Sequence, residues 1–123
     1  MACISMAEIK KYSWDQVKRE QLSDTFVRRM IYGDRVMVAQ LDIKKGSVVP
    51  EHSHENEQVT WIMKGKLRLT LEGKDIDVGE GEVLVIPSNV KHSAIALEDT
   101  LDVDIFNPIR SDWINGTDSY LRK

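Results

Sequence analysis

One stretch decides how this chain folds: GSVVPEHSHENEQVTWIMKG, residues 46–65. It holds His52 and His54, and Gln58 follows four residues after the second histidine. Side chains two positions apart in a β-strand point to the same face, so both imidazoles can approach one metal ion from one side. The third histidine, His92, ends a second motif containing glycine and proline, GEVLVIPSNVKH. Ordinary surface or loop histidines would rarely all fall within two such motifs, so the pattern predicts a metal site.

The composition excludes several classes of partner. The 123-residue chain has the length of one domain, and its 17 Lys and Arg against 20 Asp and Glu give a net charge of −3, without the basic surface that nucleic acid requires. The single cysteine, Cys3, cannot form an internal disulfide, which favours a reducing compartment. We find no apolar segment long enough for a signal peptide or a membrane span. We therefore expect a cytoplasmic protein that binds neither nucleic acid nor membrane.

Short alternating runs separated by glycine turns predict an all-β structure. Nine strands are expected, at residues 25–32, 35–43, 47–54, 58–63, 66–71, 75–78, 82–87, 92–97 and 101–106. Their even spacing is typical of a β-sandwich or barrel. In the fourth of these runs Gln58, Thr60 and Ile62 share one face, whereas the neighbouring Glu57 has the opposite parity.

The two ends of the chain differ from this strand pattern. Residues 1–24 form an N-terminal segment, in which SWDQVKREQL is either a short capped helix or part of an irregular arm. Residues 25–123 contain the barrel and a C-terminal arm with Trp113 and Tyr120. Large aromatic side chains need a docking surface. Together with Trp14, they lead us to expect a homodimer in which one of these end segments packs against the partner.

Both histidine motifs resemble those of the cupin superfamily. The first has the spacing G-x5-H-S-H-x3-Q-x6-G, and the second has G-x5-P-x4-H. The resemblance implies a jelly-roll barrel, also called a double-stranded β-helix, with one metal bound by His52, His54, His92 and Gln58. It implies a divalent transition metal, Ni, Fe, Mn, Zn or Co, among which the ligand types do not choose. The chain departs from the usual pattern at Gln58, where glutamate is common, and at Asn89, where asparagine replaces a glycine but tolerates the left-handed conformation.

A narrower resemblance extends over four segments: HSHENEQ, IPSNVKHSAIALEDT, DIFNPIRSDW and GTDSYL. They are similar to the pectin-degradation cupins of the KdgF type, with Lys91 in place of the usual proline before the ligand histidine. The resemblance implies ketonisation of 4,5-unsaturated monouronates, released from pectin or alginate, to linear keto sugar acids. It also implies a pocket set, Asp-x-Phe-x-x-x-Arg, that falls here on Asp104, Phe106 and Arg110.

The chemistry of these three residues suits such a reaction. Asp104 shares a strand face with Phe106, and an unpaired inward carboxylate is costly, so it should meet the metal, the substrate or an arginine. We expect Asp104 to transfer a proton, although a structural ion pair with Arg110 or a solvated face would also explain it. Arg110 can hold a uronate carboxylate in a bidentate fork. Phe106 offers a flat wall to a sugar ring or is part of the core.

Two other functions remain compatible with the sequence. One is a different metal-dependent cupin enzyme, such as a dioxygenase, which would require a redox metal with open coordination positions. The other is a non-catalytic sugar-binding cupin.

Arg28 and Arg29 are adjacent, so they face opposite ways in a strand. A pair of this kind is usually surface charge, but an inward arginine could meet an anionic ligand.

Overall fold

The computed structural model describes residues 8–122, and Cys3 lies outside them. The described residues form ten β-strands and three short helical segments. The strands are β1 (Glu20–Ser23), β2 (Phe26–Tyr32), β3 (Met37–Ile43), β4 (Val48–His52), β5 (Glu57–Lys64), β6 (Lys66–Leu71), β7 (Lys74–Gly79), β8 (Val83–Ile86), β9 (His92–Ala96) and β10 (Thr100–Asn107). The helical segments are η1 (Trp14–Gln16), α1 (Ser111–Asn115) and η2 (Ser119–Leu121). In this part of the chain no helix is long and apolar enough to cross a membrane.

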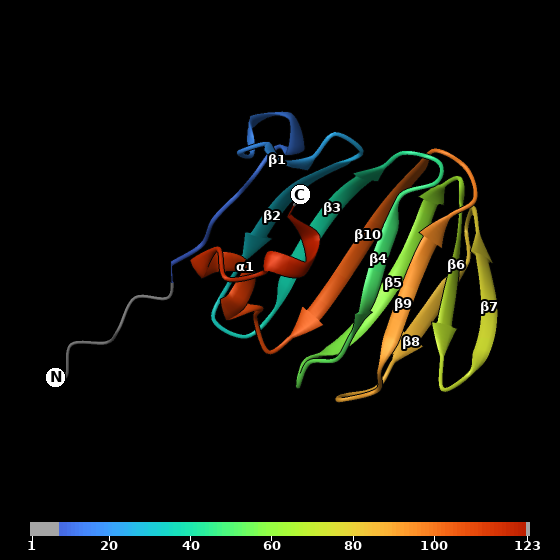
Figure 1. Cartoon of the computed structure of the whole chain (residues 1–123). Coiled ribbons are helices and arrows are strands. Elements are labelled where there is room, and N and C mark those ends of the chain that lie inside the picture. The colour runs from blue at the N-terminus through green and yellow to red at the C-terminus, as the bar shows by residue number, and fades with distance from the viewer. Residues whose placement is uncertain (1–7, 123) are drawn as a thin grey trace, which may run out of the picture.

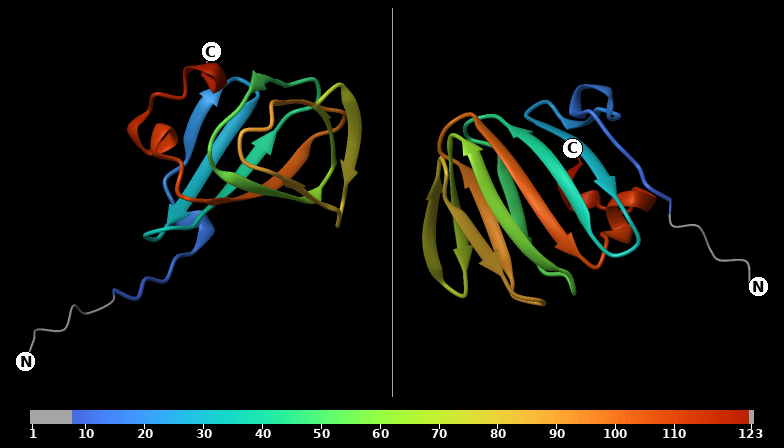
Figure 2. Two further views of the ribbon diagram at one scale, coloured as in Figure 1. Left: turned by 90° about the horizontal axis from the view of Figure 1, so that it is seen from below. Right: turned by 180° about the vertical axis from the view of Figure 1, so that it is seen from behind.

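The strands form two antiparallel sheets that face each other, as Figure 1 shows. The larger sheet has the order β1-β2-β3-β10-β5-β8, and the smaller one has the order β4-β9-β6-β7. The left view of Figure 2 shows both sheets curving around a common interior. This is the expected jelly-roll architecture, and all nine predicted strands are present, each within about two residues of its expected bounds.

Inward positions of the strands supply the core. Burial alternates along β6, where Leu67, Leu69 and Leu71 are enclosed, and along β3 and β10 in the same way. Because β10 lies between β3 and β5, every second residue of β10 faces the centre of the interior. Those positions hold Asp102 and Asp104 as well as Phe106, so the middle of the core carries two carboxyl groups.

Two turn residues have a left-handed backbone conformation, and that of Asn89 confirms the expectation from the second motif. Gly65 has φ +92, and a side chain there would collide with the backbone carbonyl of Asp99 and with Thr100. Only glycine fits this close approach between β5 and the start of β10. Asn89, in the second motif, has φ +65, so the asparagine does adopt the left-handed conformation in place of a glycine.

The N-terminal segment differs from the helical alternative. Only Trp14–Gln16 is helical, as a single 3-10 turn, and Ser13 hydrogen-bonds to the side chain of Asp15 and does not cap the backbone. The chain then becomes extended and enters the larger sheet as β1, which sequence patterning did not predict. The sheet thus begins at Glu20, inside the expected N-terminal segment.

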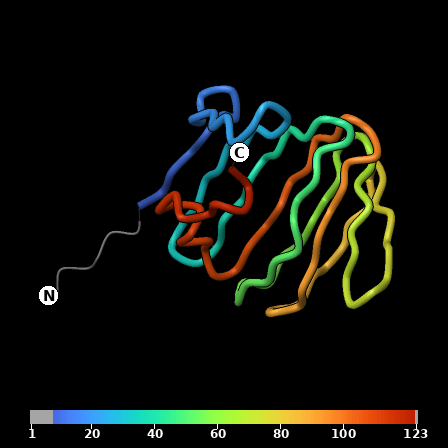
Figure 3. Tube along the Cα trace, in the orientation of Figure 1, coloured from blue at the N-terminus to red at the C-terminus, as the bar shows by residue number. Residues whose placement is uncertain are grey.

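The C-terminal arm packs on its own barrel. Figure 3 shows the arm running from the end of β10 back across β2. Its last element, η2, lies beside β4. The arm therefore covers the strands of the larger sheet that the smaller, four-stranded sheet does not cover. Trp113 and Leu121 are 4% and 6% exposed. These residues therefore have an intramolecular docking surface, and the arm no longer supplies a reason for a dimer. The homodimer itself remains a prediction.

An ion-pair cluster fixes this arm. Arg28 is the inward arginine of β2, completely buried, and its Nη1 donates to Asp118 at 2.6 Å while its Nε donates to Glu20 at 3.2 Å. Its guanidinium also lies 4.5 Å from the ring centre of Trp113. Arg122 binds Asp118 at 2.9 Å. The inward arginine thus meets carboxylates of the protein and not an external anion.

Candidate metal centre and its cavity

Three histidines converge at one end of the interior. His52 and His92 are cross-strand partners of β4 and β9, with ring centres 4.2 Å apart. His54 lies past the end of β4, in the loop to β5, and not in the same strand as His52 as its spacing had led us to expect. It still faces the same point: one ligand nitrogen from each of the three rings lies within 4.8 Å of the others.

Backbone carbonyls fix which nitrogen of each ring is free. Nδ1 of His52 is 2.8 Å from the carbonyl of Pro50, Nδ1 of His54 is 3.0 Å from that of Asn56, and Nδ1 of His92 is 2.8 Å from that of Val90. A carbonyl can only accept, so each Nδ1 carries the hydrogen and each neutral ring presents a bare Nε2. This is the tautomer that binds a metal through Nε2.

Burial also keeps these rings neutral. Removal from water lowers the pKa of His52 and that of His54 to about 4, with further lowering from the neighbouring histidines and the Arg110 charge. Burial likewise lowers the pKa of His92. Because metals bind unprotonated imidazole, all three are ready to coordinate at neutral pH.

Gln58 contributes the fourth expected group from the opposite sheet. It is 6% exposed, and its Oε1 lies 3.1 Å from Nε2 of His54. Its Nε2 donates to the hydroxyl of Thr60 at 2.8 Å, which fixes the amide orientation. Oε1 and the bare Nε2 of His54 are therefore two acceptors with no hydrogen between them. A shared cation would satisfy both.

These residues fit the metal that the sequence predicts. Nε2 of His92 is buried without a hydrogen-bond partner among the described residues, as a ligand atom would be. Three imidazoles and an amide oxygen would hold one divalent transition metal. Glu57, whose parity excluded it, is exposed on the other face of β5. Since His52 and His92 come from the smaller sheet and Gln58 from the larger one, the predicted ligands belong to both sheets.

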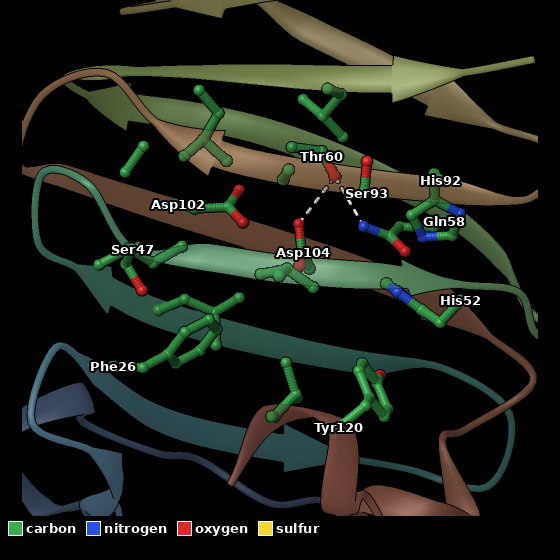
Figure 4. Close-up of a pocket in the computed structure, with 18 of the residues that line it drawn as sticks. Phe26, Ser47, His52, Gln58, Thr60, His92, Ser93, Asp102, Asp104 and Tyr120 are labelled. Atoms are coloured by element: carbon green, nitrogen blue, oxygen red, sulfur yellow. Dashed lines mark hydrogen bonds between the residues drawn. The ribbon is translucent and has the colours of Figure 1, made fainter. Parts of the chain in front are cut away.

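A cavity of about 50 Å³ extends from the histidines into the barrel. Figure 4 shows Gln58, His52 and His92 at one end of it, Asp104 near the middle and Asp102 beyond. The register of β10 with β5 explains this order, since Phe106 pairs with Gln58, Asp104 with Thr60 and Asp102 with Ile62. The space is enough for a few water molecules.

Asp104 lies at the end of a hydrogen-bonded chain. Gln58 donates to Thr60, and the Thr60 hydroxyl donates to Oδ1 of Asp104 at 2.8 Å. Burial raises the pKa of Asp104, while the hydrogen bonds from Asp102 and Thr60 and the charge of Arg110 act in the opposite direction. No ion pair joins Asp104 to Arg110, so the structural bridge considered from the sequence is absent from residues 8–122.

The guanidinium of Arg110 is already held. Its Nε and Nη2 donate to both carboxylate oxygens of Asp112, at 3.0 and 2.8 Å, and Nη2 also donates to the hydroxyl of Tyr120 at 2.7 Å. The group lies 5.0 Å from the ring centre of Phe106 and 4.6 Å from that of Trp113. The fork that we expected to hold a substrate carboxylate is therefore occupied by Asp112.

Four residues of this site were not assigned to it from the sequence. Tyr120 lines the cavity and stacks on His52 with ring centres 4.5 Å apart. Asn56 receives the His54 hydrogen bond on its carbonyl and donates its amide to the carbonyl of Pro108, which ties the ligand loop to the chain before Arg110. Thr60 and Asp102 complete the set; their strand parity with Gln58 and Asp104 was the signal that could have identified both.

Comparison with known families agrees with this geometry. The family model of the cupin domain matches residues 39–107, more than half of the chain. The chain belongs to the cupin family. Comparison with curated protein sequences finds no match.

Several solved cupins share the architecture. The structure of KdgF from Halomonas sp. has a TM-score of 0.75 and 27% sequence identity, covering 80% of this chain and 94% of that one. An RmlC-like cupin from Shewanella frigidimarina has a TM-score of 0.78 and 22% identity, covering 87% and 96%. An oxalate decarboxylase from Bacillus subtilis matches with a TM-score of 0.75 and 20% identity over 88% of this chain and 32% of that one. The cupin described here thus resembles KdgF, as its motifs had indicated.

Proposed function

We propose that this cupin binds one divalent transition metal and converts 4,5-unsaturated monouronates to linear keto sugar acids. The observation that carries the proposal is Asp104, a buried carboxyl group that faces the cavity beside the histidines and has no salt bridge among the described residues. Similarity to KdgF, at 27% identity, supports the substrate class. A buried acid that is not neutralised by a protein cation is suited to accept and return a proton.

The reaction moves one proton and breaks one ring bond. Removal of the hydrogen from the anomeric hydroxyl lets the C1–O5 bond break, which forms the C1 aldehyde and leaves an enolate at C5. Protonation at C4 then gives the C5 ketone. The atoms balance without a co-reactant, because the proton taken from the hydroxyl can be the one delivered to C4. A single carboxyl group can serve as base and then as acid.

The surroundings of Asp104 support this double role. The Thr60 hydroxyl donates to one of its carboxylate oxygens, and the residue lines the cavity. When a metal is bound, it supplies a Lewis acid that stabilises negative charge on a substrate oxygen. With neutral ligands only, the chain does not offset the charge of that ion.

Arg110 and Phe106 would bind the uronate. Since Asp112 and Tyr120 engage Nε and Nη2 of Arg110, a substrate carboxylate would meet the remaining nitrogen, Nη1, or displace one of these partners. Phe106 presents its ring between His54 and Trp113, at 5.8 and 4.9 Å between ring centres. The pair thus offers a cation and a flat apolar surface at the same end of the cavity.

The test is an assay on two substrates: unsaturated galacturonate, and the single unsaturated monouronate to which mannuronate and guluronate both give rise. The loss of ultraviolet absorbance is recorded, and the uncatalysed rate is subtracted. Asp104→Asn keeps the shape of the side chain but cannot cycle a proton, so it should lower kcat about a hundredfold or more at unchanged metal content. His92→Ala should lower the metal content itself. Absence of turnover by the metal-loaded wild type on both substrates would refute the proposed activity, and equal metal content in His92→Ala would refute the metal site.

A further inference from the structure

The second carboxyl group of the cavity, Asp102, has no role in the reaction described so far. It is 2% exposed and lies two residues before Asp104 on the same face of β10. Its cross-strand neighbours are Leu41 on β3 and Ile62 on β5. Figure 4 shows it on the far side of Asp104 from the histidines, so it lies away from the metal ligands.

Nothing near Asp102 compensates a negative charge. No arginine, lysine or histidine forms a salt bridge with it in the described part of the chain, and its Oδ1 is buried without a hydrogen-bond partner there. An ionised carboxylate with a bare buried oxygen would be very costly, whereas the carbonyl oxygen of a neutral acid tolerates this environment better. The surroundings therefore favour the protonated form of Asp102.

Asp104 is in the opposite situation. It accepts a hydrogen bond from Thr60, and the positive charge of Arg110 acts on it. The two carboxyl groups are buried two residues apart on one face of β10, where a protonated Asp102 can donate a hydrogen bond to Asp104. Two carboxylates so close cannot both be ionised at low cost, and the better-solvated member of such a pair keeps the charge. Burial, and then the charge of Asp104, raise the pKa of Asp102 well above its usual value.

We propose that Asp102 is a neutral carboxylic acid whose hydrogen bond to Asp104 holds Asp104 in the ionised, proton-accepting state. The role of this pair in turnover rests on the function proposed above; its protonation does not. Asp102 is a positioning residue, because it acts through Asp104 and lies beyond it in the cavity.

The proton count through the reaction follows from this arrangement. At rest the pair holds one proton, on Asp102, and carries one negative charge. Asp104 takes a second proton from the anomeric hydroxyl, and the pair is then neutral with two protons. Delivery of one proton to C4 restores the first state. Asp102 keeps its own proton throughout and so stabilises the form of Asp104 that begins each cycle.

The charged groups around the pair are few. Asp102 faces apolar side chains from β3, β5 and the opposite sheet, and Asp104 is the charged group that acts on it. Asp104 itself faces Thr60 on β5 and Ala39 on β3, and farther away the charge of Arg110 and the neutral, titratable ring of His92. A change of Asp102 should therefore be read out mainly in the ionisation of Asp104.

The direct test is carbon NMR of the side-chain carboxyls of the zinc-loaded wild type, which is diamagnetic, across a pH series. Backbone-linked assignment identifies Asp102 and Asp104 without any variant. We expect the Asp102 carboxyl to have the chemical shift of a protonated acid at pH 7 and the Asp104 carboxyl that of a carboxylate. An ionised Asp102 at pH 7 would overturn the inference. Because this measurement needs no substrate, it stands even if the proposed activity fails.

The kinetic test compares two variants of Asp102. Asp102→Asn keeps a hydrogen-bond donor. The acid limb of its pH profile, where kcat falls as the pH is lowered, should therefore stay within about half a pH unit of that of the wild type. Asp102→Leu removes the donor, so the limb should move up by about one to two pH units, since a hydrogen bond to an ionised group changes its pKa by that order. Asp42→Asn, which removes an exposed aspartate on β3, is the matched control and should leave the profile unchanged.

A merely structural role for Asp102 would lower the rate in both variants without moving the limb. An unmoved limb in Asp102→Leu would therefore overturn the inference. If that variant fails to fold, the wild-type NMR titration decides the question.

Discussion

Replacing Gln58 by glutamate, the residue usual in cupins, tests whether the hydrogen bonds from Gln58 through Thr60 to Asp104 influence the ionisation of Asp104. The two side chains have nearly the same shape, but a carboxylate has no hydrogen to donate to Thr60. In the wild type the amide donates to the Thr60 hydroxyl, which leaves the Thr60 hydrogen free for Asp104. In Gln58→Glu one hydroxyl hydrogen must serve two carboxylates.

The size of the effect follows from these contacts. A hydrogen bond to a charged group contributes about 1.5–3 kcal/mol, and about 1.4 kcal/mol corresponds to one pKa unit. If Thr60 turns toward the introduced carboxylate, the pKa of Asp104 should rise by about one to two units, and the added negative charge nearby acts in the same direction. The acid limb of the kcat pH profile should move up accordingly, and turnover at a pH below this limb should fall about tenfold or more. Metal affinity should increase at the same time, because an anionic ligand replaces a neutral one.

The assay combines the pH profile of substrate turnover with metal content after dialysis. Thr60→Val removes the same donor to Asp104 without adding charge at the metal, so it should shift the limb without tightening metal binding. Glu57→Gln, on the exposed face of the same strand, is the control for a change of one charge. A Gln58→Glu protein with tighter metal binding and an unchanged pH profile would refute the reasoning, since the hydrogen-bonded chain would then have no influence on Asp104.

Three further predictions concern stability and assembly. Arg28→Met should lower the free energy of unfolding by about 3–5 kcal/mol in a urea titration, because it leaves the fully buried carboxylate of Asp118 without this partner. Arg29→Met, the control, should change the free energy of unfolding little. Equal effects of the two substitutions would contradict the role of the ion-pair cluster. Lowering the pH from about 6.5 to about 4 should destabilise the metal-free protein through His52 and His54, since the unfolded chain takes up protons that the folded imidazoles, with a pKa of about 4, do not bind. Carboxyl groups with raised pKa values change the free energy of unfolding in the opposite sense, so the measurement compares wild type with His52→Ala. The free energy of unfolding should change less steeply with pH in the variant, by up to about 1.4 kcal/mol per pH unit. Identical slopes in the two proteins would exclude the effect. Sedimentation should give a homodimer, and a monomer at every concentration would end that expectation.

Strand positions, and the face of its strand on which each candidate ligand lies, could be predicted because they depend on local rules. Alternation of apolar residues placed all nine expected strands, and parity alone distinguished Gln58 from Glu57. β1 could not be predicted in this way. Its four residues, EQLS, bury only Leu22, and the strand exists because β2 offers an edge and because Glu20 meets Arg28. That interaction depends on contacts with the distant C-terminal arm.

Partners of charged side chains were the least predictable feature. Arg110 carries the expected charge at the expected place, yet its fork is engaged by Asp112, two residues away, and by Tyr120. Nothing in the sequence distinguishes an internal carboxylate from a substrate carboxylate as the partner of an arginine. Tyr120 was expected at a dimer interface for a similar reason: an aromatic residue outside the strands indicates that a docking surface exists but not which one.

The predicted metal ligands come from both sheets, which has a consequence for thermal unfolding. An ion held by β4 and β9 on one side and by β5 on the other would be lost when the sheets separate, so it binds the folded state alone. At a free concentration of about a thousand times its dissociation constant, such an ion adds about 4 kcal/mol to the folded state. The rise in melting temperature on adding Ni, Fe, Mn, Zn or Co, without substrate, therefore ranks these metals by affinity. In His92→Ala the differences between the metals should disappear. A simple melting curve can thus identify the preferred metal before any turnover is measured.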